Sequence, residues 1–292
     1  MKVLLVGANG QLGRCLKDRF PPEWAVLATD SAMLDITDYN AVINTVDIFQ
    51  PNVIINAAAY TAVDKAEEEC ELAHKVNVEG PHNLAQAAKK FNAQLVHIST
   101  DYVFDGNGTK PYKEDDLTNP LGTYGITKLK GEQLVLEVIP SALIIRTAWV
   151  FSEYGKNFVK TMVNIACNRS DLKVVADQRG CPTYAGDIAQ AILDILKTEY
   201  IGGIYHYCGD EEVSWCDFAI AIFEKAKSVD LIPLIPVVRP ISSNEYPTLA
   251  VRPKYSTLSC DKVDKLGVEP SHWRSSLLYV LQRWVNEPAI RI

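Results

Sequence analysis

Short apolar runs alternate with amphipathic stretches along the first half of the chain. Residues 2–6 read Lys-Val-Leu-Leu-Val, and comparable strand-like runs follow at 24–28, 52–57, 94–99 and 143–146. Between them, apolar residues recur at helical spacing over 11–20, 38–49, 67–91 (with a break expected near Pro81) and 124–138. The runs are solidly apolar rather than alternating, which is typical of strands covered on both faces. The pattern predicts an α/β fold built on a doubly wound parallel sheet.

The second half is less regular and carries more proline. Helices are expected at 158–168, 185–197, 215–227 and 273–285, separated by proline-bearing connections. We expect residues 1–148 to form the doubly wound domain, with 174–208 and 242–260 returning to it. The remainder of 149–292 is expected to form a smaller, discontinuous α/β lobe, because a single hydrophobic core usually stops growing at this chain length.

Composition removes several classes of protein. The chain has 292 residues, 48% of them hydrophobic, and a net charge of −7, so neither nucleic acid nor a membrane is an expected partner. Its seven cysteines are scattered without a CxxC pair, which argues against a disulfide framework or a metal site. No leader or membrane span is recognisable, so we expect a cytoplasmic protein. The acidic cluster at 67–69 is interpreted as a solvated helix face.

A glycine-rich turn joins the first predicted strand to the first helix. Gly7, Gly10 and Gly13 allow a tight turn and close approach of the backbone to a pyrophosphate, which the helix N-terminus attracts. Asp30 ends the second strand, where a carboxylate accepts hydrogen bonds from ribose hydroxyls. Its charge repels a 2′-phosphate, so the choice between two dinucleotide cofactors stays open. The turn predicts a Rossmann-type dinucleotide site.

Tyr124 and Lys128 lie four residues apart, on the same face of a predicted helix. An ammonium beside a phenol favours the phenolate and lowers the tyrosine pKa, which makes the phenol a usable proton donor or acceptor. Ser99 and Thr100 lie at the carboxyl end of the fourth strand, where either hydroxyl is placed to bond a carbonyl oxygen. Alone, each feature has a structural explanation; together with the glycine turn, they favour a reductive active site.

These motifs resemble the extended short-chain dehydrogenases/reductases and, within them, the dTDP-4-dehydrorhamnose reductases. The resemblance extends over most of the chain, to about Cys260. It is carried by residues 7–13, 34–37, 56–66, 99–106, 124–128, 146–149, 177–180, 182–183 and 252–253. It implies hydride transfer from NADPH, or NADH, to the C4 ketone of dTDP-4-dehydro-L-rhamnose, a sugar nucleotide.

The resemblance also implies individual roles. Tyr124 is the general acid, Lys128 lowers its pKa and bonds the nicotinamide ribose, and Thr100 polarises the ketone. The expected substrate contacts are Asp101 and Trp149. The expected cofactor contacts, in addition to Tyr124 and Lys128, are Gly7, Gly10, Gln11, Leu12, Gly13, Asp30, Asp35, Ile36, Ala59, Tyr60 and Thr61.

Two departures and two alternatives limit this interpretation. Some relatives dimerise through magnesium held by glutamates, which residues 14–16 and 185–187 do not supply, so we expect a monomer or a homodimer without a metal bridge. No clamp for a 2′-phosphate is evident beside Asp30. The alternatives are a sugar-nucleotide epimerase or dehydratase, which recycles tightly held NAD, and a non-catalytic regulatory subunit that binds NAD(P).

Overall fold

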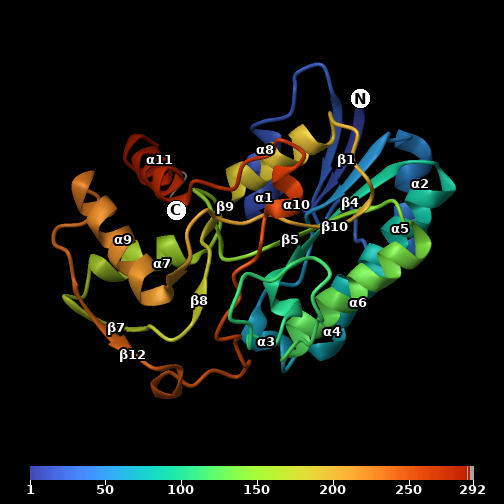
Figure 1. Cartoon of the computed structure of the whole chain (residues 1–292). Helices are drawn as coiled ribbons and strands as arrows, with labels where there is room; N and C mark the ends of the chain where they lie inside the picture. Colours follow the sequence, from blue (N-terminus) through green and yellow to red (C-terminus); the bar gives the residue numbers. More distant parts are fainter. Residues whose placement is uncertain (288, 290–292) are drawn as a thin grey trace.

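A six-stranded parallel sheet forms the centre of the larger lobe (Figure 1). The computed structural model describes residues 1–287 and 289. The strand order is β10-β5-β4-β3-β1-β2, with every neighbouring pair parallel. The order reverses at β1, and such a switch point is where open α/β sheets bind ligands. The strands are β1 (Lys2–Val6), β2 (Ala25–Thr29), β3 (Val53–Asn56), β4 (Gln94–Thr100), β5 (Leu143–Thr147) and β10 (Gly203–His206).

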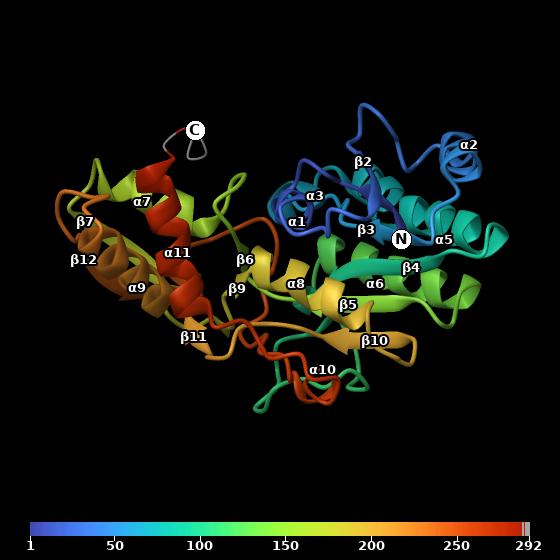
Figure 2. The same cartoon turned by 90° about the horizontal axis from the view of Figure 1, so that it is seen from above.

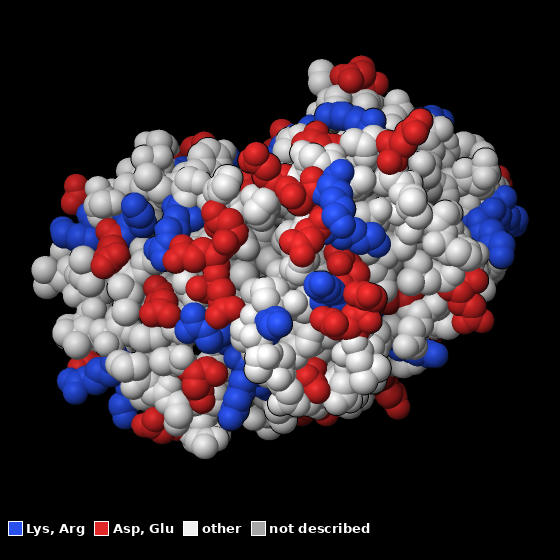
Figure 3. All heavy atoms as spheres, in the orientation of Figure 1, with Lys and Arg blue, Asp and Glu red and all other residues white. Residues whose placement is uncertain are grey.

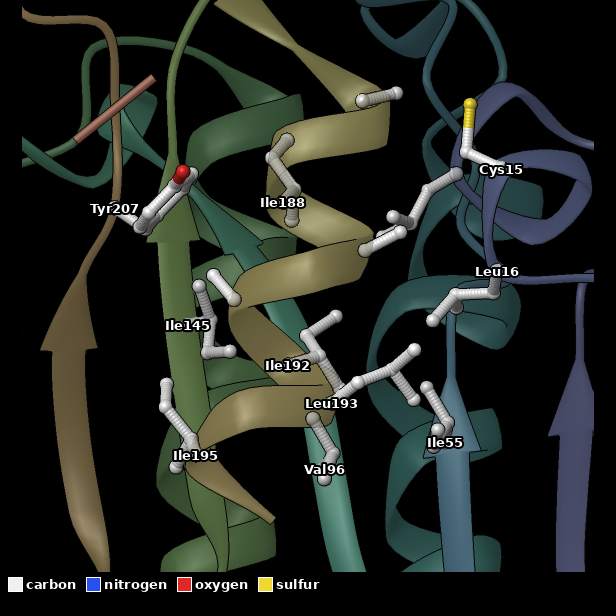
Figure 4. Packing of buried hydrophobic residues seen from close by; sticks show 14 of the residues in the cluster. Cys15, Leu16, Ile55, Val96, Ile145, Ile188, Ile192, Leu193, Ile195 and Tyr207 are labelled. Carbon is white, nitrogen blue, oxygen red and sulfur yellow. The ribbon is translucent and has the colours of Figure 1, made fainter. Parts of the chain in front are cut away.

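Helices cover both faces of the sheet because its strands are apolar on both sides. Successive residues of β1 enter opposite cores. Val3 and Leu5 pack beneath α1 (Gln11–Lys17) and α8 (Ala185–Ile195), where Figure 4 shows Ile188 and Ile192 of α8 against the sheet. Leu4 and Val6 pack on the opposite side, against three longer helices: α2 (Tyr39–Phe49), α5 (Gly80–Lys90) and α6 (Thr123–Val138).

The break expected near Pro81 takes a different form. The chain passes from α3 (Val63–Ala66) through α4 (Cys70–His74) into a π-helical turn at Lys75–Glu79, which leads directly into α5. Pro81 lies in the first turn of α5 and has no N–H to bond to the carbonyls of the helical turn that precedes it. The irregularity therefore precedes the proline.

The smaller lobe has its own core. Strands β7 (Asp171–Val175) and β12 (Val237–Ile241) form a parallel pair. This pair packs with one helix that precedes it in sequence, one that lies between the two strands and one that follows them. Figures 1 and 2 show this lobe beside the larger one, with the short strands between them. Its helices are α7 (Phe158–Ala166), α9 (Trp215–Ser228) and α11 (Trp273–Asn286); the short pairs are β6 (Val150–Phe151) with β9 (Thr183–Tyr184), and β8 (Arg179–Gly180) with β11 (Val213–Ser214).

The chain crosses between the lobes more than once. Helix α8 packs on α1, β10 pairs with β5, and Val263 of α10 (Asp261–Asp264) lies in the same core as α8. The apolar pattern did not predict β10, because four residues that include a tyrosine and a histidine carry little strand signal. The smaller lobe is thus discontinuous in sequence.

The surface is mixed in charge. On the face shown in Figure 3, acidic and basic side chains are interleaved over both lobes. Within residues 1–287 and 289, no helix combines the length and apolar character needed to cross a bilayer.

Candidate active site

The predicted site residues gather at the carboxyl edge of the sheet, where each strand runs into a loop. Gly7 follows β1, Asp30 follows β2, Thr100 ends β4 and Trp149 comes just after β5. Tyr124 and the rest of the first turn of α6 contact the turn that follows β4. The topology therefore brings five separate segments to one edge.

The glycine turn has the geometry of a backbone cradle. Gly7 has a φ of 77°, and a side chain there would lie 2.5 Å from the backbone after β3. A side chain at Gly13 would overlap the Gly7 carbonyl. Gly10 begins α1 without a side-chain cap, so Gln11 and Leu12 present free backbone N–H groups. These features fit the diphosphate of a dinucleotide.

Asp30 is held in one orientation beside this turn. Asn9 Nδ2 donates to its Oδ2 at 2.6 Å, and the backbone N–H groups of Ala32 and Met33 donate to its Oδ1 at 3.0 and 3.1 Å. A carboxylate fixed in this way is placed for a ribose hydroxyl next to the diphosphate cradle.

The two residues expected at the adenine differ in exposure. Asp35 is exposed, and its Oδ1 accepts from the backbone N–H and hydroxyl of Thr37 at 2.9 and 2.8 Å. Ile36 is only 5% exposed and packs against Gly80 at the start of α5. Its side chain belongs to the core, so the structure does not bring that side chain to the edge of the sheet.

Ala59, Tyr60 and Thr61 follow β3, as expected for residues beside a cofactor, and a buried amide ties them to α6. Asn77 Oδ1 accepts from the Tyr60 N–H at 2.8 Å, and its Nδ2 donates to the Tyr60 carbonyl at 3.1 Å and to Thr127 Oγ1 at 3.2 Å. Sequence reasoning missed Asn77, because it lies among other polar residues such as His74, Lys75 and Glu79 and therefore carries no local signal.

Tyr124 is half-buried in the first turn of α6. Burial raises its pKa to about 12, and the Asp101 charge acts in the same direction, while a hydrogen bond with Thr100 opposes them. The expected lowering of this pKa by Lys128 is not found: the causes of the shift are burial, Thr100 and Asp101, and Lys128 Nζ donates to the Ile98 carbonyl. Tyr124 is therefore a neutral phenol at neutral pH, the protonated form that a general acid requires.

Lys128 lies one turn further along α6 and is buried. Its Nζ donates to the Ile98 carbonyl of β4 at 2.6 Å. Burial lowers its pKa to about 8, opposed by the charge of Glu132. Glu132 in turn pairs with the buried Arg146 of β5 at 2.7 Å. A partly desolvated ammonium thus sits beneath the catalytic edge, supported by a buried ion pair.

Thr100 and Asp101 form a second polar group beside the phenol. Thr100 Oγ1 donates to Asp101 Oδ1 at 3.0 Å and accepts from the Tyr102 N–H at 3.2 Å. Burial raises the Asp101 pKa to about 6, and its Oδ2 has no partner in the part of the chain that the structure describes. Thr100 has one hydroxyl proton, so donating it to a substrate ketone requires the bond to Asp101 to open.

Trp149 lies between the lobes in a strained backbone conformation. Its φ of 46° costs a bulky residue about 1–3 kcal/mol. Its indole stacks on Trp215 with centroids 3.5 Å apart, and a side chain at Gly180 would overlap the ring. Trp149 also packs against buried clusters on both sides of the lobe junction, and its indole lies where an aromatic ring could contact a sugar. Sequence reasoning missed Trp215, which is 66 residues away and adjacent only in the fold.

The acidic cluster is not simply a solvated face. Glu67 accepts from the Thr123 N–H at 2.8 Å and from its hydroxyl at 2.9 Å, so it caps the helix that carries Tyr124. Glu69 accepts from the Tyr60 hydroxyl at 2.6 Å. The carboxylate at the start of α6 also complements the helix dipole. Each contact joins two segments that are separated in sequence, so the pattern of apolar residues within either segment does not predict it.

A family model and individual known proteins both match this chain over nearly its whole length. A family model described as the RmlD substrate binding domain matches residues 1–286. A dTDP-4-dehydrorhamnose reductase of Aggregatibacter actinomycetemcomitans is 48% identical over 94% of this chain and 97% of its own. A structure of a reductase of the same name from Clostridium acetobutylicum has a TM-score of 0.90 and 43% identity, covering 97% of this chain and 99% of its own. One from Bacillus anthracis, in complex with NADP, has a TM-score of 0.89 and 38% identity, covering 98% and 99%.

The buried Asp101 predicts a pH-dependent cost in stability. Its folded-state pKa of about 6 exceeds the ordinary value of 3.8, so its contribution is favourable in acid and is lost as the pH rises through 6. The variant Asp101→Asn should therefore gain about 2 kcal/mol relative to the wild type between pH 4.5 and 7.5. Urea unfolding across this range measures the gain. The exposed Asp230→Asn is the control, and a pH-independent difference for Asp101→Asn would contradict the assignment.

Proposed function

The chain belongs to the dTDP-4-dehydrorhamnose reductase family, and we propose that it reduces dTDP-4-dehydro-L-rhamnose to dTDP-L-rhamnose. This is the last step of dTDP-rhamnose biosynthesis. One observation carries the proposal: the glycine cradle, the buried Thr100 and Lys128 and the half-buried Tyr124 lie at one edge of the sheet. The full-length match to reductases of this name supports the choice of substrate.

The cradle fits a nicotinamide dinucleotide, since Gly7 and Gly13 let the turn pack tightly against neighbouring backbone and α1 begins without a side-chain cap. NADPH, with NADH as an alternative, supplies the hydride that reaches C4 of the sugar. Gly7, Gly10, Gln11, Leu12 and Gly13 hold the diphosphate, and Asp30 meets the adenosine ribose. Asp35, the backbone of Ile36 and residues 59–61 line the remainder of the cofactor site. Asp30 disfavours a 2′-phosphate by charge, whereas a close structural relative was solved with NADP.

Proton delivery falls to Tyr124. The neutral phenol donates its proton to the alkoxide that develops at C4, while Thr100 turns its hydroxyl from Asp101 to the same oxygen. Lys128 bonds the nicotinamide ribose and stabilises the phenolate once the proton has left. Asp101 and Trp149 contact the sugar nucleotide. Holding donor and ketone at reacting distance supplies up to about 7–11 kcal/mol in favourable systems.

We place this reaction in the cytoplasm, with a monomer or a homodimer that needs no metal bridge. All seven cysteines are free thiols, which suits a reducing compartment. In the later of the two stretches that lack the expected glutamate, Asp187 Oδ2 accepts from the hydroxyls of Ser271 and Ser276 at 2.6 and 2.9 Å. Its carboxylate is thus satisfied within the chain.

The direct test follows cofactor absorbance at 340 nm with enzymatically generated dTDP-4-dehydro-L-rhamnose. We expect substrate-dependent oxidation with both NADPH and NADH, and the ratio of kcat/KM values gives the preference. A purified chain that carries bound NAD and shows no net oxidation would favour an epimerase or dehydratase. Cofactor binding without turnover of any keto-sugar nucleotide would favour a regulatory subunit.

Tyr124→Phe removes only the acidic hydroxyl. We expect kcat to fall by roughly 10²–10⁴-fold, while NADPH fluorescence shows near-normal cofactor affinity. The control is Tyr279→Phe on the exposed side of α11, which loses a hydroxyl far from the sheet edge. Full activity of Tyr124→Phe would show that another group delivers the proton.

A further inference from the structure

The loop between β6 and α7 closes around a side chain of the glycine turn. Asn157 Nδ2 donates to Gln11 Oε1 at 2.9 Å, and the single hydroxyl proton of Ser152 is shared between Gln11 Oε1 and the Tyr154 carbonyl, each 3.0 Å from Oγ. Ser152 is fully buried. Asn157 begins a helix of the smaller lobe, whereas Gln11 begins the helix that follows the cradle. One amide oxygen therefore joins the two lobes at the cofactor turn.

The loop is shaped for this contact. Asn157 Nδ2 also donates to the Ser152 carbonyl at 2.8 Å, and its Oδ1 caps α7 by accepting from the Lys160 N–H at 3.0 Å. Gly155 has a φ of 64°, and a side chain there would lie 3.3 Å from Gln11 Cγ. The same asparagine thus starts α7, closes the loop and holds Gln11.

Further contacts attach this loop to both lobes. Tyr154 donates its hydroxyl proton to Asp18 Oδ2 at 2.6 Å, and the Arg14 guanidinium lies 5.4 Å from the Tyr154 ring centre. The buried Glu153 accepts from Arg283 of α11 at 2.6 Å. The loop is therefore fixed to α1 on one side and to α11 on the other.

The loop is continuous with the expected sugar-binding surface. Trp149 precedes Ser152 by three residues, and the intervening strand β6 pairs with β9 between the lobes (Figure 2). Trp149 itself stacks on Trp215 of α9. Gln11 is thus connected to the indole through a segment of at most eight residues.

We propose that Ser152 and Asn157 are positioning residues that couple cofactor binding to sugar-nucleotide binding through Gln11. This rests on the proposed function, which places Gln11 at the cofactor diphosphate and Trp149 at the sugar. A diphosphate that fixes the position of Gln11 also fixes the loop after β6 and the Trp149 indole. Binding of either ligand therefore orders the residues that contact the other ligand. Because coupling is reciprocal, each ligand tightens the other by the same factor, typically about 5–150-fold.

The test measures NADPH affinity by fluorescence with and without saturating dTDP-L-rhamnose, a pair that cannot react. The wild-type chain should bind NADPH at least about 5-fold more tightly when the sugar nucleotide is present. In Asn157→Ser, a hydroxyl still caps α7 but is too short to reach Gln11, so this factor should fall to near one. The affinity for each ligand alone should change little, whereas the thermal midpoint should fall, because the bond from Nδ2 to the Ser152 carbonyl is also lost. Asn168→Ser, at the other end of α7, should keep the wild-type factor.

Ser152→Ala provides an independent variant, because it removes the second donor and leaves the helix cap intact. Ser152→Ala should also reduce the coupling factor. If Asn157→Ser does not fold, the coupling factor of Ser152→Ala tests the proposal alone. Independent binding of the two ligands by the wild-type chain, or full coupling in both variants, would overturn the proposal. Turnover of the keto-sugar by the wild type is measured in parallel, so a catalytically active chain with uncoupled ligands would leave the proposed function standing.

Discussion

Burial of polar groups at one edge of an apolar sheet is the constraint on which the rest of the structure depends. Desolvation raises the Tyr124 pKa from 10 to about 12 and lowers the Lys128 pKa to about 8, and one carboxylate oxygen of Asp101 has no partner among residues 1–287 and 289. These states cost stability, and they persist because the surrounding elements compensate. The Ile98 carbonyl holds the ammonium, and the Arg146–Glu132 pair supports the helix beneath it. In such an environment electrostatic interactions with a developing alkoxide are stronger than in water.

Much of the fold could be predicted from sequence because its central strands are continuous apolar runs with amphipathic helices between them. The helices over 39–49, 123–138 and 273–286 begin and end within two residues of the expected positions. Strand β10 and the short inter-lobe pairs lacked such a signal, since their partners are distant in sequence. The same reason hid Glu67, which caps a helix 56 residues away. The spacing of Tyr124 and Lys128 predicted their shared helix, but spacing carries no information on burial, so it gave the wrong direction for the phenol pKa.

The two lobes divide the work of a bimolecular reduction. The larger lobe carries the cradle, the phenol and the ammonium, while the smaller lobe supplies Trp215 to the stack behind Trp149. The protein forms no covalent bond with either ligand, so the rate of reduction depends on holding the cofactor and the sugar at reacting distance and in the correct orientation. The Gln11 contact with Ser152 and Asn157 lies where the lobes meet at the cradle. A preorganised contact of this kind reduces the conformational freedom lost when the second ligand binds.

The most direct measurement follows the hydride itself. The chain is incubated with NADPH deuterated at the transferable C4 position and with dTDP-4-dehydro-L-rhamnose, and the sugar product is analysed by proton NMR. We predict dTDP-L-rhamnose with deuterium at C4 of the sugar and stoichiometric formation of NADP⁺. A sugar product without deuterium, or label that remains on the cofactor while the sugar is converted, would contradict reduction at C4.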